Sequence, residues 1–168
     1  MAERPIVIYG DPVLREESRL VEKIDQETKD LVSDMTDTLK EARGLGLAAV
    51  QIGVLKRVFI VDLQAIDVTS KLHVFINPEI IETTGEIELE EGCLSFPGIY
   101  QKVVRPSSVR FRALNIDGES FEMSFDGMAA RAVLHEYDHL DGKLFIDYLS
   151  SVSRSLLRSK LRRLNAAS

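Results

Sequence analysis

Residues 126–142 read DGMAARAVLHEYDHLDG, the segment around which the other elements are expected to pack. Its apolar residues repeat at helical spacing after Asp126, a suitable N-cap, and the pattern ends at Gly142. Met128 and Ala132 lie in phase with the two histidines of HEYDH, on the same helix face. The sequence therefore predicts a helix that turns this face toward the core, with the rest of the chain packed around it.

The chain before this helix is dominated by strand signals. Five segments are rich in β-branched and aromatic residues, namely RVFIVDL at 57–63, HVFINPEIIETT at 73–84, GEIELEE at 85–91, VRFRAL at 109–114 and SFEMSF at 120–125. The last two segments flank NIDG, whose Asp117-Gly118 pair is a hairpin signal. These strands are expected to pair mostly in antiparallel fashion.

Two further helices are expected, one near each end of the chain. The first covers residues 25–43, with Asp25 as its N-cap and Gly44 as its stop. The last helix covers about residues 151–164, and its apolar stripe consists of Leu156, Leu157, Leu161 and Leu164. The order of a helix, many strands and then helices predicts an α+β fold and not a doubly wound sheet.

The N-terminal segment carries weaker signals. Residues 5–9 read as a short strand, and Asp11-Pro12 reads as a turn that could open a brief helical turn. No repeat or linker is evident, and a length of 168 residues suits one core, so residues 1–168 are expected to form a single domain.

Composition narrows the classes of function. The net charge of −6 argues against nucleic-acid binding by the whole surface, so no DNA partner is expected. No segment approaches the roughly 18 apolar residues of a membrane span, and the N-terminus has neither an apolar signal core nor a transit-like composition. The expected location is the cytoplasm, although an organellar protein whose transit segment was trimmed would look the same.

The sharpest chemical signal is HEYDH. His135 and His139 lie four residues apart, which stacks both imidazoles on one helix face within reach of one metal ion. Glu136 follows the first histidine and can lie beside a metal-bound water without being a ligand. The alternative is a pair of surface histidines with a solvated glutamate, but two of the three histidines in the chain fall in this pattern. The pattern indicates metal-assisted hydrolysis with a glutamate base.

The natural third ligand is Cys93, the only cysteine. It cannot form an intramolecular disulfide, and a lone thiol fits a reducing compartment. A lone cysteine is more often a small buried apolar residue. Cys93, however, lies in EEGCLSFPG, a segment marked by Gly and Pro at the end of an expected strand, where functional groups are common.

A glycine-rich segment, GLGLAAVQIG at residues 44–53, follows the first expected helix. Its glycines permit close approach of the backbone to a ligand. It follows a helix and lacks a Lys-Ser/Thr ending, so nucleotide-binding motifs do not fit. The simple alternative is a flexible connector, but Gln51 is a polar residue in an apolar run, and its amide needs a partner.

Together, GLGLAAVQ at 44–51, EGCLS at 91–95 and HEYDH at 135–139 resemble the three signature motifs of the peptide deformylase family, in order and spacing. The opening segment with its DPVLR turn and the first and last helices are also similar to the bacterial type, so the resemblance covers nearly the whole chain. It implies removal of the N-formyl group from the first methionine of nascent polypeptides, with release of formate.

The resemblance also implies roles for individual residues. The implied metal ligands are Cys93, His135 and His139, with water as the fourth. The implied catalytic groups are Glu136 as general base and then acid, and the Gln51 amide and Leu94 backbone N–H as an oxyanion hole. The implied substrate-binding residues are Gly44, Leu45, Gly46, Leu89, Gly92, Arg105, Met128 and Ala132. Leu134 departs from the family pattern, because many relatives carry glutamine there.

One divalent metal ion is the expected cofactor, since one thiolate and two imidazoles accept zinc or iron(II). The resemblance implies Fe²⁺ as the physiological metal, with Zn²⁺, Ni²⁺ or Co²⁺ as substitutes. Two alternative functions remain open. A metallopeptidase would use the same helix motif but usually a third His or Glu, and a binding module with structural zinc would need four protein ligands, of which only three are apparent.

The last segment differs in charge from the rest. Residues 151–168 hold five basic side chains and no acidic one, within an acidic chain. The simple explanation is a solvated basic face on an amphipathic helix. The sharper one, which the resemblance to bacterial deformylases implies, is a weak, salt-dependent contact with ribosomal RNA.

Overall fold

The computed structural model describes residues 2–64 and 66–167. Its seven strands form two antiparallel sheets. The larger sheet has the order β1 (Gly46–Ala48), β2 (Val58–Asp62), β3 (Leu72–Thr84), β6 (Ser108–Leu114) and β7 (Ser120–Asp126). The smaller sheet is a ribbon of β4 (Ile87–Gly92) and β5 (Tyr100–Arg105). The predicted α+β class with antiparallel strands is confirmed.

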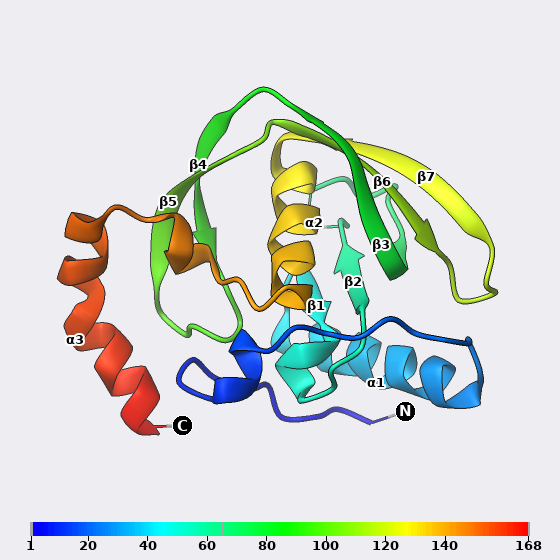
Figure 1. Ribbon diagram of the computed structural model, residues 1–168, viewed down its shortest axis with the longest axis horizontal. Helices are drawn as coiled ribbons and strands as arrows, with labels where there is room; N and C mark the ends of the chain where they lie inside the picture. The colour runs from blue at the N-terminus through cyan, green and yellow to red at the C-terminus, as the bar shows by residue number, and fades with distance from the viewer. Residues whose placement is uncertain (1, 65, 168) are drawn as a thin grey trace.

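The HEYDH helix, α2 (Gly127–Leu140), lies in the middle of the molecule, between the five-stranded sheet and the β4–β5 ribbon (Figure 1). Asp126 is its N-cap as expected, although the Asp126 side chain makes no capping hydrogen bond. Ten residues of α2 are buried, including both histidines. A helix enclosed on several sides places its polar residues in a low-dielectric interior, where each needs a partner.

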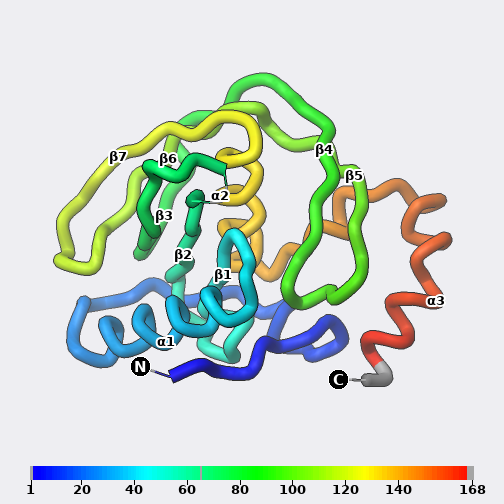
Figure 2. The backbone as a smooth tube through the Cα atoms, turned by 180° about the vertical axis from the view of Figure 1, so that it is seen from behind, coloured from blue at the N-terminus to red at the C-terminus, as the bar shows by residue number. Residues whose placement is uncertain are grey.

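Helix α1 (Gln26–Ala42) packs on the opposite face of the large sheet (Figure 2). The Asp25 side chain accepts a hydrogen bond from the Thr28 backbone N–H and caps the helix as predicted. The expected stop is displaced by one residue, because Arg43 adopts the left-handed conformation with φ 57° and ends the helix before Gly44. Arg43 is therefore held in a conformation that non-glycine residues seldom adopt.

Strand β2 shows why the core is continuous across the large sheet. Phe59 and Val61 pack on the α2 side, whereas Val58 and Ile60 pack on the α1 side. A strand covered on both faces carries apolar residues on both faces, as residues 58–61 of β2 do. The sheet is thus the middle layer of three, between α1 and α2. Packing on both faces of the sheet fixes the position of β1 relative to α2.

Helix α3 (Ser151–Ala167) lies at the edge of the molecule beside the β4–β5 ribbon (Figures 1 and 2). A third apolar cluster lies under this helix. Leu157 is buried, and Leu161 and Leu164 pack against the same cluster. The expected stripe was wrong for Leu156, which is 80% exposed. Residues 157, 161 and 164 share one helix face, and residue 156 is turned about 100° away from it.

The N-terminal segment differs from the expected strand. Residues 5–8 belong to no sheet, although the Val7 N–H donates to the Gln51 carbonyl and the Tyr9 N–H to the Ser95 carbonyl. The turn prediction is confirmed, since Asp11 caps a short 3-10 helix, Pro12–Arg15. Two other 3-10 helices, Ala49–Ile52 and Phe145–Tyr148, connect the elements around the candidate site. Over residues 2–64 and 66–167, none of the helices combines the length and the hydrophobicity that a membrane span requires.

Candidate metal centre and active site

The three predicted metal ligands come together in the structure. The ligand atoms of Cys93, His135 and His139 all lie within 4.8 Å of one another. Cys93 comes one residue after β4, and its Sγ is 3.5 Å from His139 Nε2. The histidines reach the same point from successive turns of α2, with ring centroids 5.0 Å apart. One thiol and two imidazoles that converge in the interior are a donor set suited to a divalent transition metal.

Charge around the two imidazoles also fits a bound cation. Burial lowers the pKa of His139 well below its usual value, which keeps this ring in the neutral form that binds metals. Burial opposes charge on His135 too, but Cys93 and Glu91 outweigh it and raise the pKa of His135 well above its usual value. The Glu91 carboxylate therefore places negative charge beside His135.

Glu91, which the sequence analysis did not single out, orients His135. The His135 Nδ1–H donates to Glu91 Oε2 at 2.6 Å, which leaves Nε2 for the metal position. Glu91 also accepts two hydrogen bonds from Arg105 and one from Arg131, at 2.7 to 2.8 Å. Partners of this kind fix the tautomer and ring direction of a ligating histidine. Glu91 lies two residues before Cys93, and side chains two residues apart on a strand point to the same side. This spacing was the sequence signal that could have placed Glu91 beside the ligands.

Gln51 is held by both ends of its amide. Its Oε1 accepts from the Ala48 backbone N–H at 3.0 Å, so the NH₂ group must point the other way. That NH₂ donates to Ser95 Oγ at 3.1 Å and lies 3.6 Å from Cys93 Sγ. The side chain is 1% exposed, so the donor is fixed beside the metal position. Ser95 is a second residue that sequence reasoning missed.

Glu136 lies against β1 with a carboxylate that is only partly engaged. It is 5% exposed, and its Oε1 has no hydrogen-bond partner among the described residues. Burial raises the pKa of Glu136 to about 7, close to the range in which a carboxylate both takes and gives protons. A Cβ on Gly46 would lie 2.8 Å from Glu136 Oε2, so only glycine leaves room for the carboxylate there.

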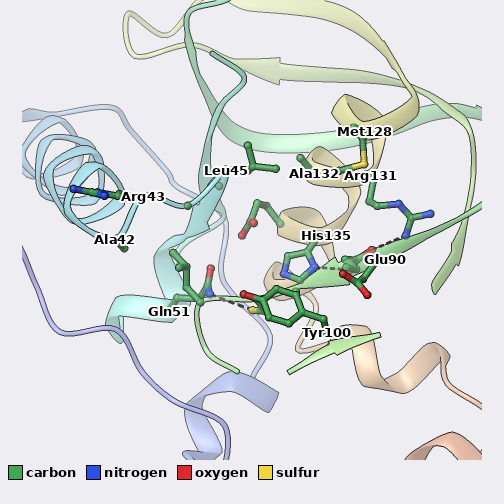
Figure 3. Close-up of a pocket in the computed structure, with 17 residues that line it drawn as sticks. Ala42, Arg43, Leu45, Gln51, Glu90, Tyr100, Met128, Arg131, Ala132 and His135 are labelled. Carbon is green, nitrogen blue, oxygen red and sulfur yellow. Dashed lines mark hydrogen bonds and ion pairs between the residues drawn. The ribbon is translucent and has the colours of Figure 1, made fainter. Parts of the chain in front are cut away.

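These groups open into a cavity of about 340 Å³. Eleven of the predicted site residues line it: Gly44, Leu45, Gly46, Gln51, Gly92, Cys93, Leu94, Met128, Ala132, His135 and Glu136. Figure 3 shows Leu45, Met128 and Ala132 on one side of it and Gln51 and Tyr100 on the other, with His135 between. The cavity thus has an apolar wall facing a polar centre.

Comparison with known proteins gives a consistent result. The chain matches the family described as Polypeptide deformylase over residues 3–155. A peptide deformylase of Clostridium botulinum is 54% identical over 147 residues, or 88% of this chain and 97% of that relative. A peptide deformylase from Legionella pneumophila superposes with a TM-score of 0.90 at 43% identity, covering 99% of each chain. One from Thermus thermophilus gives a TM-score of 0.91 at 38% identity, covering 98% of this chain and 99% of that one.

The chain belongs to the polypeptide deformylase family. It is therefore a hydrolase, and the resemblance carried by the three motifs is confirmed. The metal dependence of the family agrees with the Cys93, His135 and His139 cluster.

Three predicted deformylase site residues do not line the cavity. His139 is buried behind it, 1% exposed, as a residue that touches only the metal position would be. Leu89 is half-buried on β4. Arg105 differs most from the expectation of a peptide contact, because it is 3% exposed and its donors are already engaged. Its Nε and Nη2 donate to Glu91 and its Nη1 donates to Asp138, so these donors face inward and not toward a substrate.

Asp138, inside HEYDH, completes the network that supports the deformylase site. It accepts from Arg105 Nη1 at 2.8 Å and from the Tyr148 hydroxyl at 2.7 Å. The Arg105 guanidinium also stacks 4.8 Å from the Tyr148 ring centroid. Asp138 therefore ties α2 to β5 and to the turn before α3, a role that its place between two ligands did not reveal.

Proposed function

We propose that this chain hydrolyses the formamide bond of N-formylmethionyl nascent peptides, releasing formate and a peptide with a free N-terminal amine. The observation that carries this proposal is the convergence of the Cys93, His135 and His139 donors beside the buried carboxylate of Glu136. Family membership supports the reaction class.

The three donors are proposed to hold one divalent cation, which supplies Lewis acidity that polarises a carbonyl oxygen and lowers the pKa of water. Thiolate and imidazole ligands suit iron(II) and zinc, and we infer Fe²⁺ as the native ion, with Zn²⁺, Ni²⁺ or Co²⁺ as substitutes. Glu91 supports this assignment, because it directs His135 Nε2 toward the centre.

Glu136 is the proposed proton carrier. Its ionised carboxylate takes a proton from the water that attacks the formyl carbon, and then gives that proton to the departing amine nitrogen. A pKa of about 7 for Glu136 means that neither transfer is strongly uphill near neutral pH. Glu136 lines the cavity, which supports its contact with the attacking water.

The Gln51 amide and the Leu94 backbone N–H are the proposed donors to the formyl oxygen as it becomes negative. The Gln51 NH₂ is fixed by Ala48 and Ser95, so it needs no reorganisation when charge develops. Preorganised donors of this kind typically lower the barrier by several kcal/mol.

The methionine side chain is proposed to enter the cavity and to pack against the apolar wall formed by Leu45, Met128 and Ala132. The following peptide has two strand edges available, because β1 is an edge of the large sheet and β4 belongs to the two-stranded ribbon. Both contribute to the cavity, through Gly46 and through Gly92. An extended peptide could add to either edge by main-chain hydrogen bonds, which are independent of sequence. This mode suits an enzyme that acts on many different nascent chains.

The deciding experiment measures formate release from a formyl-Met tripeptide and cleavage of its unformylated counterpart, after anaerobic loading with each of the four metals. Rapid formate release with no cleavage of the unformylated peptide is expected. Cleavage of ordinary peptide bonds would indicate a metallopeptidase instead. Metal binding without either reaction would indicate a structural metal and would overturn the proposal.

A contact with the ribosome is proposed for α3. Arg154, Arg158 and Arg162 recur every four residues and line a shallow groove of about 460 Å³ together with Tyr9. Such a row of guanidinium groups suits the phosphates of an RNA backbone, at the cost of strong salt dependence. Cosedimentation with ribosomes at two salt concentrations tests this contact, and salt-independent or absent binding would refute it.

A further inference from the structure

Tyr100 is an exposed aromatic residue at the edge of the cavity that the proposed reaction does not use. It is the first residue of β5, it is 62% exposed, and it lines the cavity. Figure 3 shows its ring on the side of the cavity opposite Leu45 and Ala132. A tyrosine ring offers a large apolar face with a negative centre, and this one is open to whatever enters the cavity.

Gly92 is the reason that Tyr100 reaches the cavity. The two residues pair directly across the ribbon, and Tyr100 is the only residue of β5, all of which is described, that lines the cavity. A Cβ on Gly92 would lie 2.6 Å from Tyr100 Cε1, so the ring lies across the Gly92 backbone. Gly92 does not have a positive φ. This glycine therefore provides space for the ring and not an unusual backbone conformation.

Glu90 lies next to this ring on the same face of the ribbon. Glu90 and Gly92 are two residues apart on β4 and so point to one face, and Tyr100 lies directly opposite Gly92. Glu90 and Tyr100 are thus diagonal neighbours, a separation that long side chains span. Glu90 is exposed and lines the cavity, whereas Lys102, its direct partner across the ribbon, does not line it. A carboxylate beside an aromatic face suits a guanidinium, which stacks on the ring and donates to the oxygen atoms.

The direction of the substrate chain brings its second residue to this place. The opposite face of the ribbon carries Glu91, which bonds to His135 and so faces α2. The methionine side chain is proposed to pack on that side, against residues of α2. Consecutive side chains of an extended peptide point to opposite sides. The second side chain therefore points to the face that carries Tyr100 and Glu90, and the third points back toward α2.

We propose that Tyr100 and Glu90 form a binding subsite for the second residue of the substrate, and that this subsite favours arginine. The guanidinium lies on the Tyr100 ring and donates to the Glu90 carboxylate. This inference rests on the proposed function, because it takes the first residue to be a formylated methionine packed on the α2 side. Both contacts are exposed to solvent, so the preference is modest and other second residues are still accepted.

The test compares kcat/KM for formyl-Met-Arg-Ala and formyl-Met-citrulline-Ala, measured by formate release. Citrulline keeps the length and the planar end group of arginine but has no charge. The wild-type enzyme should favour arginine by about three- to tenfold, because a cation on an exposed ring and an exposed ion pair each contribute about two- to threefold. With the same two residues at the third position, the ratio should lie near one. A ratio of one at the second position, or a larger ratio at the third, would overturn the inference.

Two variants assign the preference to its residues. Tyr100→Leu and Glu90→Gln should each lower the arginine-to-citrulline ratio at the second position by about twofold or more, whereas Tyr100→Phe keeps the ring and should keep the ratio. The ratio within one variant is unaffected by the fraction of active, metal-loaded enzyme. Glu88→Gln is the matched control, because Glu88 is exposed on the same face of β4 but does not line the cavity. An equal drop in Glu88→Gln and Glu90→Gln would indicate general attraction to an acidic ribbon and would refute the subsite.

Failure of this inference is distinguishable from failure of the proposed function. If the wild-type enzyme releases formate from both peptides at equal rates, only the arginine subsite is refuted. If the metal-loaded wild-type enzyme releases no formate from any formyl-Met peptide, the proposed function itself is wrong.

Discussion

Gly46→Ala tests the placement of Glu136 with a single added methyl group. The new Cβ would lie 2.8 Å from both Cγ and Oε2 of Glu136, where ordinary contacts begin near 3.4 Å. The carboxylate must therefore move by at least about 0.6 Å, and misplacements near 1 Å can cost about 100-fold in rate. Gly46 does not have a positive φ, so alanine introduces no backbone strain of its own. We expect kcat/KM for a formyl-Met peptide to fall about 10- to 100-fold.

Metal content measured on the same Gly46→Ala preparation should stay at the wild-type level, because the added methyl group contacts the carboxylate and not a ligand. A double-mutant cycle isolates the effect. In a Glu136→Ala background the carboxylate is gone, and Gly46→Ala should cause little further loss of activity. Wild-type kcat/KM in the single variant, or an equal loss in both backgrounds, would refute the argument that Gly46 acts by leaving room for Glu136.

Three further outcomes are expected. Cys93→Ala and His139→Ala should each lose most of the bound metal, and full metal content by elemental analysis in both would contradict their role as ligands. Glu136→Ala should keep its metal but lose activity by a factor of about 100 or more, so an active, loaded variant would rule out Glu136 as the proton carrier. The iron-loaded enzyme should lose activity in air with oxidation of Cys93, detectable by mass spectrometry, whereas days of stability with an unmodified thiol would count against iron beside this thiolate.

Much of the fold was predictable because most helices and strands carry a regular spacing of apolar residues within their own sequence. The HEYDH helix and the long strands have apolar patterns that depend only on residues within the same element. Strands β1 and β5 were missed, since three residues of β1 and the mixed YQKVVR of β5 carry no strong alternation on their own. Residues 5–8 showed the reverse error. Their apolar pattern suggested a strand, but the Val7 N–H donates to the Gln51 carbonyl in a 3-10 helix and not to a neighbouring strand.

The residues of the candidate site also divide into those that the sequence could predict and those that it could not. The three candidate ligands were recognisable from residue type, spacing and local sequence, whereas the role of Gln51 was expected from the family resemblance. The partners that hold these side chains were not recognisable, because each contact joins residues that are distant in sequence: Glu91 reaches His135 across 44 residues, and Gln51 reaches Ser95 across the same separation. Arg105 was expected from the resemblance to contact the peptide. Its buried partners Glu91 and Asp138 could not be read from its residue type or its place in the sequence.

The β4–β5 ribbon explains why so many charges are buried beside the metal position. The ribbon brings Cys93 to two histidines on a different element, α2, and side chains on a strand alternate between its faces. A slip of one residue would turn Cys93 and Glu91 away from α2 together. Apolar contacts are non-directional and would resist such a slip weakly. Glu91, in contrast, accepts directed hydrogen bonds from Arg131 and His135 on α2, and Arg105 donates to Asp138 on the same helix.

Buried ion pairs of this kind contribute little net stability, because the loss of hydration opposes the attraction between the charges. The directions of these hydrogen bonds are nevertheless specific. They favour one position of the ribbon against α2 over positions shifted by one residue. The same contacts that orient His135 therefore also set the position of the Cys93 thiol. The candidate ligands on these two separate elements are thus aligned by hydrogen-bonded charges.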